Sequence, residues 1–182
     1  MRFVGADAGV MVSVKVLKTF FIVAVLFAWI PGNAAALEEG SSAPAFTLKD
    51  LQGREIALAA FAGRPLVLKL TTTWCPACQM MSAEVARIAR RLADMDVAVM
   101  DVFLQDSDAM IRNYLQHWDP GALRYAAVVD DGRVMEEYNV YLIPRVLLLD
   151  AKLHVARDGG LISGDDIIRW AEKAVSGAEN VP

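Results

Sequence analysis

Short apolar runs separated by turn residues recur along the chain. Such runs, four to eight residues long and rich in β-branched residues, are typical of buried strands. The strongest predict strands at residues 65–70, 97–104, 125–129 and 145–149. Weaker patterns predict strands at residues 45–48, 55–58 and 153–157.

Helical periodicity lies between the strand predictions. Met81, Val85, Ile88 and Leu92 recur at spacings of four, three and four, which places them on one face of a helix. A second helix is predicted up to His117, with Asp106 or Ser107 as its cap, a helical turn at 134–138, and a last helix beginning at Ser163.

The order of these elements predicts an α/β fold. Two short strands form an N-terminal β-hairpin extension, a β-α-β-α-β segment follows, and two strands and a helix end the chain. Parallel crossovers followed by an antiparallel pair give a three-layer arrangement, in which a mixed central sheet carries helices on both faces.

The N-terminus has the pattern of an export signal. Basic Lys15 and Lys18 precede an apolar run at 20–30, and the small residues 34–36 follow a Pro-Gly breaker. We predict a signal peptide at 1–36, a flexible leader at 37–44 and a folded domain at 45–178. An uncleaved membrane anchor is the alternative, although the run is shorter than the roughly 20 residues a spanning helix needs. Either form places the domain in the periplasm or otherwise outside the cytoplasm.

Composition and charge argue against a nucleic-acid-binding function. The chain has 55% hydrophobic residues and a net charge of −4, and removal of residues 1–36 leaves 15 Lys and Arg against 21 Asp and Glu, a net charge of −6. The sequence has no basic run, so nucleic-acid binding has no support.

The candidate chemistry lies in Trp74-Cys75-Pro76-Ala77-Cys78. If Pro76 opens the helix, Cys75 lies at a helix N-terminus, where free N–H groups and the macrodipole favour a thiolate. Cys75 is then the nucleophile, and Cys78, one turn deeper, is the resolving thiol. Trp74 offers a flat apolar surface to a polypeptide. The pair forms a redox-active disulfide, and we expect no other cofactor and no metal.

A zinc site and a structural disulfide are two alternative interpretations of the cysteine pair. A zinc site needs four ligands, and the chain adds only His117 and His154, which are 37 residues apart. A purely structural disulfide would close a loop of two residues and gain little loop-closure entropy. Both readings are disfavoured by these arguments.

The dipeptide Ile143-Pro144 immediately precedes a predicted strand. Proline there removes a ladder donor. A cis peptide bond would expose the backbone of Ile143 for pairing with an incoming chain, whereas an ordinary trans proline would only open an edge strand. The topology favours the cis form.

Together these motifs resemble the thioredoxin superfamily, and within it the TlpA/ResA-like (AhpC/TSA-related) extracytoplasmic thiol-disulfide oxidoreductases. The resemblance spans about 43–176 and rests on the opening at 43–48, the motif at 73–78, Tyr138-Asn139-Val140 before the proline, and the strand at 146–150. It implies reduction or exchange of disulfides in exported proteins. It also implies a membrane thiol reductase as electron donor and a role in cytochrome c maturation.

Three features depart from the family pattern, and one of them is the order Pro76-Ala77, where ResA-type proteins place Glu before Pro. Lys69 stands where thioredoxins carry an acid, and Arg145 follows the proline where an acid is usual. Lys69 either extends its ammonium to water or stabilises a thiolate, as a cation or as a neutral proton acceptor. Arg145 either stabilises a thiolate, selects acidic partners, or is an indifferent surface residue. The alternative functions are a copper-handling protein and a redox-inert binding module of the same fold.

Overall fold

The computed structural model describes residues 36–118 and 120–178. The predicted signal peptide therefore lies outside the described residues except for Ala36. No helix among the described residues is both long and apolar enough to cross a membrane.

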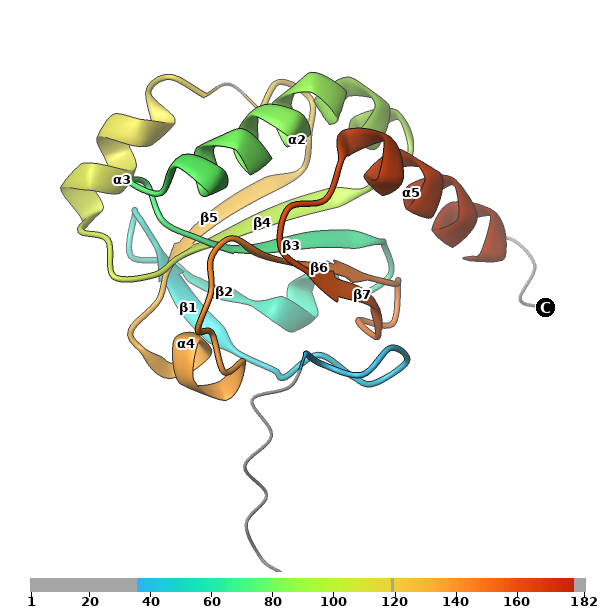
Figure 1. Ribbon diagram of the computed structural model, residues 1–182, viewed down its shortest axis with the longest axis horizontal. Helices are drawn as coiled ribbons and strands as arrows, with labels where there is room; N and C mark the ends of the chain where they lie inside the picture. Colours follow the sequence, from blue (N-terminus) through green and yellow to red (C-terminus); the bar gives the residue numbers. More distant parts are fainter. Residues whose placement is uncertain (1–35, 119, 179–182) are drawn as a thin grey trace, which may run out of the picture. The chain divides into compact units, whose positions relative to one another are not determined.

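The central feature is a seven-stranded mixed sheet with the order β2-β1-β5-β4-β3-β6-β7 (Figure 1). Its strands are β1 (Thr47–Asp50), β2 (Glu55–Ala57), β3 (Leu66–Thr71), β4 (Ala98–Phe103), β5 (Tyr125–Val129), β6 (Arg145–Leu149) and β7 (Val155–Gly159). Strands β3, β4 and β5 are parallel, whereas β6 and β7 at one edge and β1 and β2 at the other are antiparallel. The predicted hairpin extension and mixed sheet are confirmed.

Helices cover both faces of the sheet, as the sequence predicts (Figure 1). They are the 3₁₀ helix η1 (Leu58–Phe61), α2 (Pro76–Asp94), α3 (Asp108–Leu115), α4 (Arg133–Glu137) and α5 (Gly164–Ala178). Helices α2, α3 and α5 lie over one face, and η1 and α4 lie over the other. This arrangement follows from strand alternation, because Val67 and Val99 pack with the α2 and α5 side chains while Leu66 and Leu68 pack with Leu58 on the opposite face.

The helical periodicity correctly identifies the buried face of α2. Met81, Val85, Ile88 and Leu92 are all at most 2% exposed and lie against the sheet and α5. The start of α5 is held to α2 because the Gly164 N–H donates to Glu84 Oε2 at 2.8 Å. These contacts fix the long helix whose first residue follows Cys75.

Residues 37–44, predicted as a flexible leader, are hydrogen-bonded to the segment at the start of β7. The Gly40 N–H donates to the Val155 carbonyl at 2.7 Å, and the Ala43 N–H donates to the Leu153 carbonyl at 3.0 Å. Leu37 and Ala43 also lie against the core on the η1 side. The structure therefore differs from the prediction, because the exposed edge at β7 supplies backbone partners that the local sequence does not reveal.

Candidate active site

The turn between β3 and α2 positions the two cysteines. Asp106, in the loop after β4, accepts the Thr73 N–H at 2.9 Å and the Thr73 hydroxyl at 2.7 Å. The Gln79 side-chain amide donates to the Thr73 carbonyl at 2.8 Å. Ser107, rather than Asp106, caps α3, which leaves the Asp106 carboxylate free to hold this turn.

Cys75 is the N-cap residue of α2, and Pro76 occupies the first turn, as predicted. The Cys75 sulfur accepts the backbone N–H of Cys78 at 3.4 Å. Burial of Cys75 raises its pKa. Hydrogen bonds from the Cys78 side chain and from the N–H groups of Cys78 and Ala77 lower it by more, so the net pKa lies below the usual range. The local geometry therefore favours a thiolate at Cys75.

Cys78 lies in a contrasting environment. Its side chain is 1% exposed, whereas Cys75 is half-buried. Burial raises the pKa of Cys78 above its usual range and outweighs hydrogen bonds from the Thr71 side chain and the Thr72 backbone, while the adjacent Cys75 raises it further. The two thiols, both free in the structure, thus have pKa values shifted in opposite directions and differ in access.

This difference predicts an ordered reaction with an alkylating agent. Iodoacetamide should modify Cys75 first, and the midpoint of its pH–rate profile should lie below that of an unperturbed cysteine, because only the thiolate reacts. Modification of Cys78 should be slower and require higher pH. Mass mapping of the reduced protein across a pH series measures both profiles. Equal rates and midpoints at the two residues would contradict this assignment.

The loop before β6 lies opposite the nucleophile. The Ile143–Pro144 peptide bond is cis, as the sequence predicts. The Cys75 sulfur lies 4.0 Å from the Ile143 carbonyl oxygen, so residues 68 positions apart in the chain meet at the site.

Lys69 forms a buried ion pair beneath the cysteine helix. Its side chain is 1% exposed, and its Nζ lies 3.0 Å from Asp101 Oδ1 on the adjacent parallel strand. The ammonium also donates to Ser82 Oγ at 2.8 Å. The prediction that the ammonium extends to water is therefore wrong, because the side chain turns toward α2 and finds its counter-ion on β4.

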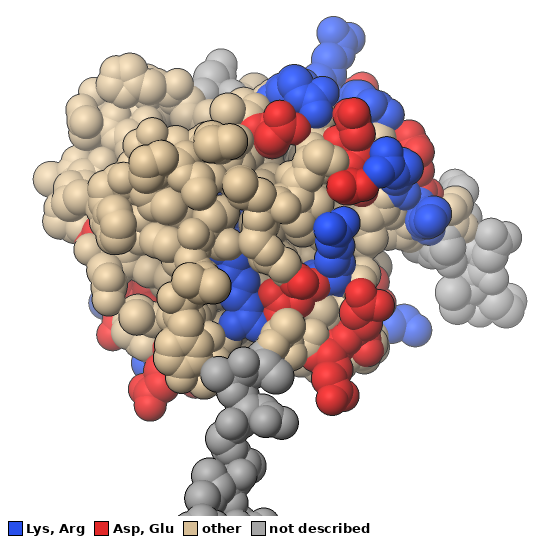
Figure 2. All heavy atoms as spheres, in the orientation of Figure 1, with Lys and Arg blue, Asp and Glu red and all other residues tan. Residues whose placement is uncertain are grey.

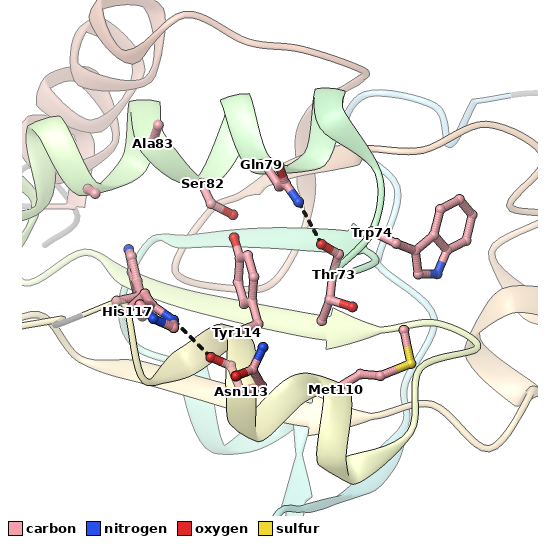
Figure 3. Close-up of a pocket in the computed structure, with 11 residues that line it drawn as sticks. Thr73, Trp74, Gln79, Ser82, Ala83, Met110, Asn113, Tyr114 and His117 are labelled. Atoms are coloured by element: carbon pink, nitrogen blue, oxygen red, sulfur yellow. Dashed lines mark hydrogen bonds between the residues drawn. The ribbon is translucent and has the colours of Figure 1, made fainter.

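Asp101 and its neighbours are the site residues that sequence reasoning missed. The Tyr125 hydroxyl donates to Asp101 Oδ2 at 3.0 Å. Burial raises the pKa of Asp101 more than Lys69 and Tyr125 lower it. Tyr114, on α3, directs its hydroxyl toward Ser82 (Figure 3). The available signal was a lone acid in one apolar strand and a lone lysine in another.

Arg145 is nearly buried rather than a surface residue. Its guanidinium donates to both oxygens of Asp158, with Nε–Oδ1 at 2.9 Å and Nη2–Oδ2 at 2.5 Å, and also to the Tyr138 carbonyl. The prediction that Arg145 is an indifferent surface residue is therefore wrong, whereas selection of acidic partners and stabilisation of a thiolate stay predictions. Its charge is paired with Asp158 on the neighbouring strand β7.

A groove of about 670 Å³ lies beside the cysteines between α2 and α3 (Figure 3). Trp74 and Met110 stand at one end, and Asn113, Tyr114 and His117 line the α3 side. Large exposed apolar side chains occur on segments that adjoin the site, namely Trp74, Met80, Met110, Tyr141, Leu142 and Leu161. Figure 2 shows few charges on the part of this face over α3, while acids and bases gather toward α5.

The described residues contain no group of three or more His, Cys, Asp or Glu side chains that could hold a metal ion. The predicted site residues converge at the junction of β3, α2 and the loop before β6. Trp74 is exposed, Cys75 and Ile143 are half-buried, and Cys78 and Lys69 are buried.

Comparison with known proteins agrees with this geometry. The chain is 25% identical over 166 residues to the sporulation thiol-disulfide oxidoreductase A of Bacillus subtilis, which covers 90% of this chain and 100% of that protein. It is 25% identical over 123 residues to the thiol-disulfide oxidoreductase ResA of the same organism, which covers 67% of each.

The fold matches that of thioredoxin domains. The thioredoxin domain of a thiol-disulfide oxidoreductase from Bacteroides vulgatus superposes with a TM-score of 0.65 at 22% identity, covering 76% of this chain and 99% of that domain. The model of the AhpC/TSA family matches residues 40–170, which include both cysteines, Lys69 and the cis-proline. The chain belongs to the AhpC/TSA family and has the thioredoxin fold.

Proposed function

We propose that this protein is an exported thiol-disulfide oxidoreductase that reduces or exchanges disulfides in extracytoplasmic proteins. The observation that best supports the proposal is that the pKa values of two thiols one helical turn apart are shifted in opposite directions. Cys75 is accessible with a lowered pKa, and Cys78 is buried with a raised pKa. The related proteins named as thiol-disulfide oxidoreductases support the same activity.

The proposed reaction uses these two thiols in sequence. The Cys75 thiolate attacks one sulfur of a client disulfide, the client S–S bond breaks, and the other client sulfur leaves as a thiolate. Cys78 then loses its proton and attacks the Cys75 sulfur, which releases the second client thiol. The protein is left with a Cys75–Cys78 disulfide, and two electrons and two protons from a membrane thiol reductase restore the dithiol.

The surface around Cys75 suits a polypeptide client. Trp74 is 55% exposed beside the nucleophile, and Tyr141 and Leu142, just before Ile143, are 75% and 83% exposed. Exposed apolar side chains that adjoin a reactive group are typical of a protein-binding surface. Protein thiols and disulfides are therefore the proposed partners, and maturation of cytochrome c is the proposed pathway role.

Two supporting roles remain proposals. Ile143 and Pro144 are proposed to present backbone to the client opposite Cys75. The buried Lys69–Asp101 ion pair is proposed to support the reaction of Cys78, with the Asp101 carboxylate offsetting the positive charge of the lysine.

Insulin reduction tests the activity, and the redox potential of the cysteine pair tests its direction. The reduced protein should accelerate precipitation of insulin in the presence of a thiol donor. A potential near −270 mV against glutathione would indicate a reductant, and one near −120 mV an oxidant. The absence of any cysteine-dependent rate would overturn the proposal in favour of a redox-inert module, and stoichiometric copper(I) binding would favour a copper-handling protein.

A further inference from the structure

The residue just after the predicted signal peptide is held by a buried carboxylate. The Leu37 backbone N–H donates to Asp158 Oδ2 at 2.7 Å, and the Asp158 side chain is 3% exposed. The half-buried Leu37 side chain lies against the core on the η1 side. The backbone bonds of Gly40 and Ala43 to the segment around β7 fix the residues that follow. The hydrogen bond to Asp158, the packing of the Leu37 side chain and the backbone bonds of the following residues together fix the position of the Leu37 nitrogen.

The same carboxylate reaches the active-site loop. Asp158 is the ion-pair partner of Arg145, which directly follows the cis-proline and also donates to the Tyr138 carbonyl. One side chain on β7 thus connects Leu37 with the loop that presents Ile143 to Cys75.

We infer that the export signal is cleaved between Ala36 and Leu37 and that the new α-ammonium group of Leu37 binds Asp158. This inference rests on the proposed export. Water adds across the peptide bond, so that Ala36 leaves with a carboxylate and Leu37 keeps the nitrogen as an amine. Small residues at Ala34 and Ala36 match the A-x-A pattern of such sites.

The chemical consequence of the cut is a change of charge at one fixed atom. Before cleavage the Leu37 nitrogen is a neutral amide donor to Asp158. After cleavage it is an ammonium at neutral pH, because an α-amino group ordinarily titrates near pH 7.7–8.0. A charge-assisted hydrogen bond to a carboxylate is stronger than one from a neutral amide. Arg145 shares the carboxylate and reduces the gain, since it places a second positive charge nearby.

The first experiment locates the cut. The full chain is expressed with its own leader in a bacterial host that exports through the general secretory route, and the product is analysed by intact mass and N-terminal sequencing. The expected product begins at Leu37. An uncut chain, or a first residue at any other position, overturns the inference.

The second experiment tests the ionic contact. Three mature chains are compared by urea unfolding at neutral pH: one beginning at Leu37, one beginning at Leu37 with an acetylated amine, and one beginning at Ala36. Acetylation keeps an N–H donor and removes the charge, and the chain beginning at Ala36 controls for the added acyl group. The free Leu37 amine is expected to lower the unfolding equilibrium constant about fivefold relative to the other two. Equal stability of the three chains overturns the inference.

The Asp158→Asn variant provides the control. In that background the three chains should be equally stable, and a persisting advantage of the Leu37 amine would contradict the assignment of Asp158. If this variant does not fold, the advantage in the wild-type background is measured from pH 7 to about pH 10 instead, where it should shrink as the amine loses its proton.

Insulin reduction by the same preparations separates this inference from the proposed function. Loss of the amine effect with normal reductase activity counts only against the Asp158 contact. Absence of reductase activity with a normal amine effect counts only against the oxidoreductase function.

Discussion

Replacing Cys75 by serine is expected to reduce the rate of insulin reduction by roughly 10³-fold or more, to the uncatalysed rate, because a serine hydroxyl does not ionise at neutral pH. Cys75 is the N-cap residue of α2, and serine there preserves the cap, so the fold should be retained. The turbidity assay measures the rate, and circular dichroism checks the fold. A folded Cys75→Ser protein with more than about a tenth of the wild-type rate would contradict the account.

Cys78→Ser serves as the matched variant. It should also lose turnover, because the mixed disulfide can no longer be resolved internally, but it should keep a single rapid reaction with a client disulfide. A variant lacking both cysteines supplies the background rate. If Cys78→Ser turned over at the wild-type rate, the resolving role would be wrong.

Replacing Asp101 by asparagine is expected to destabilise the protein by about 3 kcal/mol, because it leaves the Lys69 ammonium buried without a counter-ion. The side chains of Lys69 and Asp101 are 1% and 3% exposed, so water cannot replace the lost charge. Urea denaturation measures the loss. A loss of less than about 1 kcal/mol in the free energy of unfolding would show that the charge of Asp101 contributes less to stability than its burial indicates.

The same variant should shift the redox potential. An uncompensated positive charge beneath α2 favours thiolates and therefore the dithiol form, so the pair should become more oxidising by about 30 mV, a tenfold change in the equilibrium constant. The double variant Lys69→Met with Asp101→Leu removes both charges and should restore both stability and potential toward the wild type. An unchanged potential in Asp101→Asn would exclude an electrostatic effect of Lys69 on the thiols.

The order of the elements was predictable because it depends on the local pattern of apolar and polar residues. Each central strand is a short apolar run, and α2 repeats its buried residues at helical spacing. The position of Cys75 was equally local, since Pro76 marks the first turn of a helix that follows a strand. These features depend on residues close together in the chain.

The ion pair between Lys69 and Asp101 depends instead on tertiary structure. The two residues are direct neighbours only because β3 and β4 pair in parallel with that register. A lone lysine in an apolar strand does not reveal which strand lies beside it. The partner of Arg145 was hidden for the same reason, because Asp158 lies on a strand whose alignment with β6 includes a register shift.

The contacts of the leader at 37–44 also could not be predicted from local sequence. Its Glu, Gly and Ser residues are typical of a mobile segment, and nothing in their spacing indicates a partner. The hydrogen bonds to the segment around β7 arise because that edge of the sheet is otherwise open. The position of the leader therefore depends on which strand lies at the open edge of the sheet, and this is known only from the folded structure.

The most direct measurement of the central claim is to trap the mixed disulfide. The Cys78→Ser protein is mixed with a peptide disulfide, quenched with acid, and digested for mass mapping. We expect a stable peptide adduct on Cys75, formed in a single rapid reaction, and none on Cys78 when the reciprocal Cys75→Ser protein is tested under the same conditions. Adduct formation on Cys78 at a comparable rate, or no adduct on Cys75, would contradict the claim.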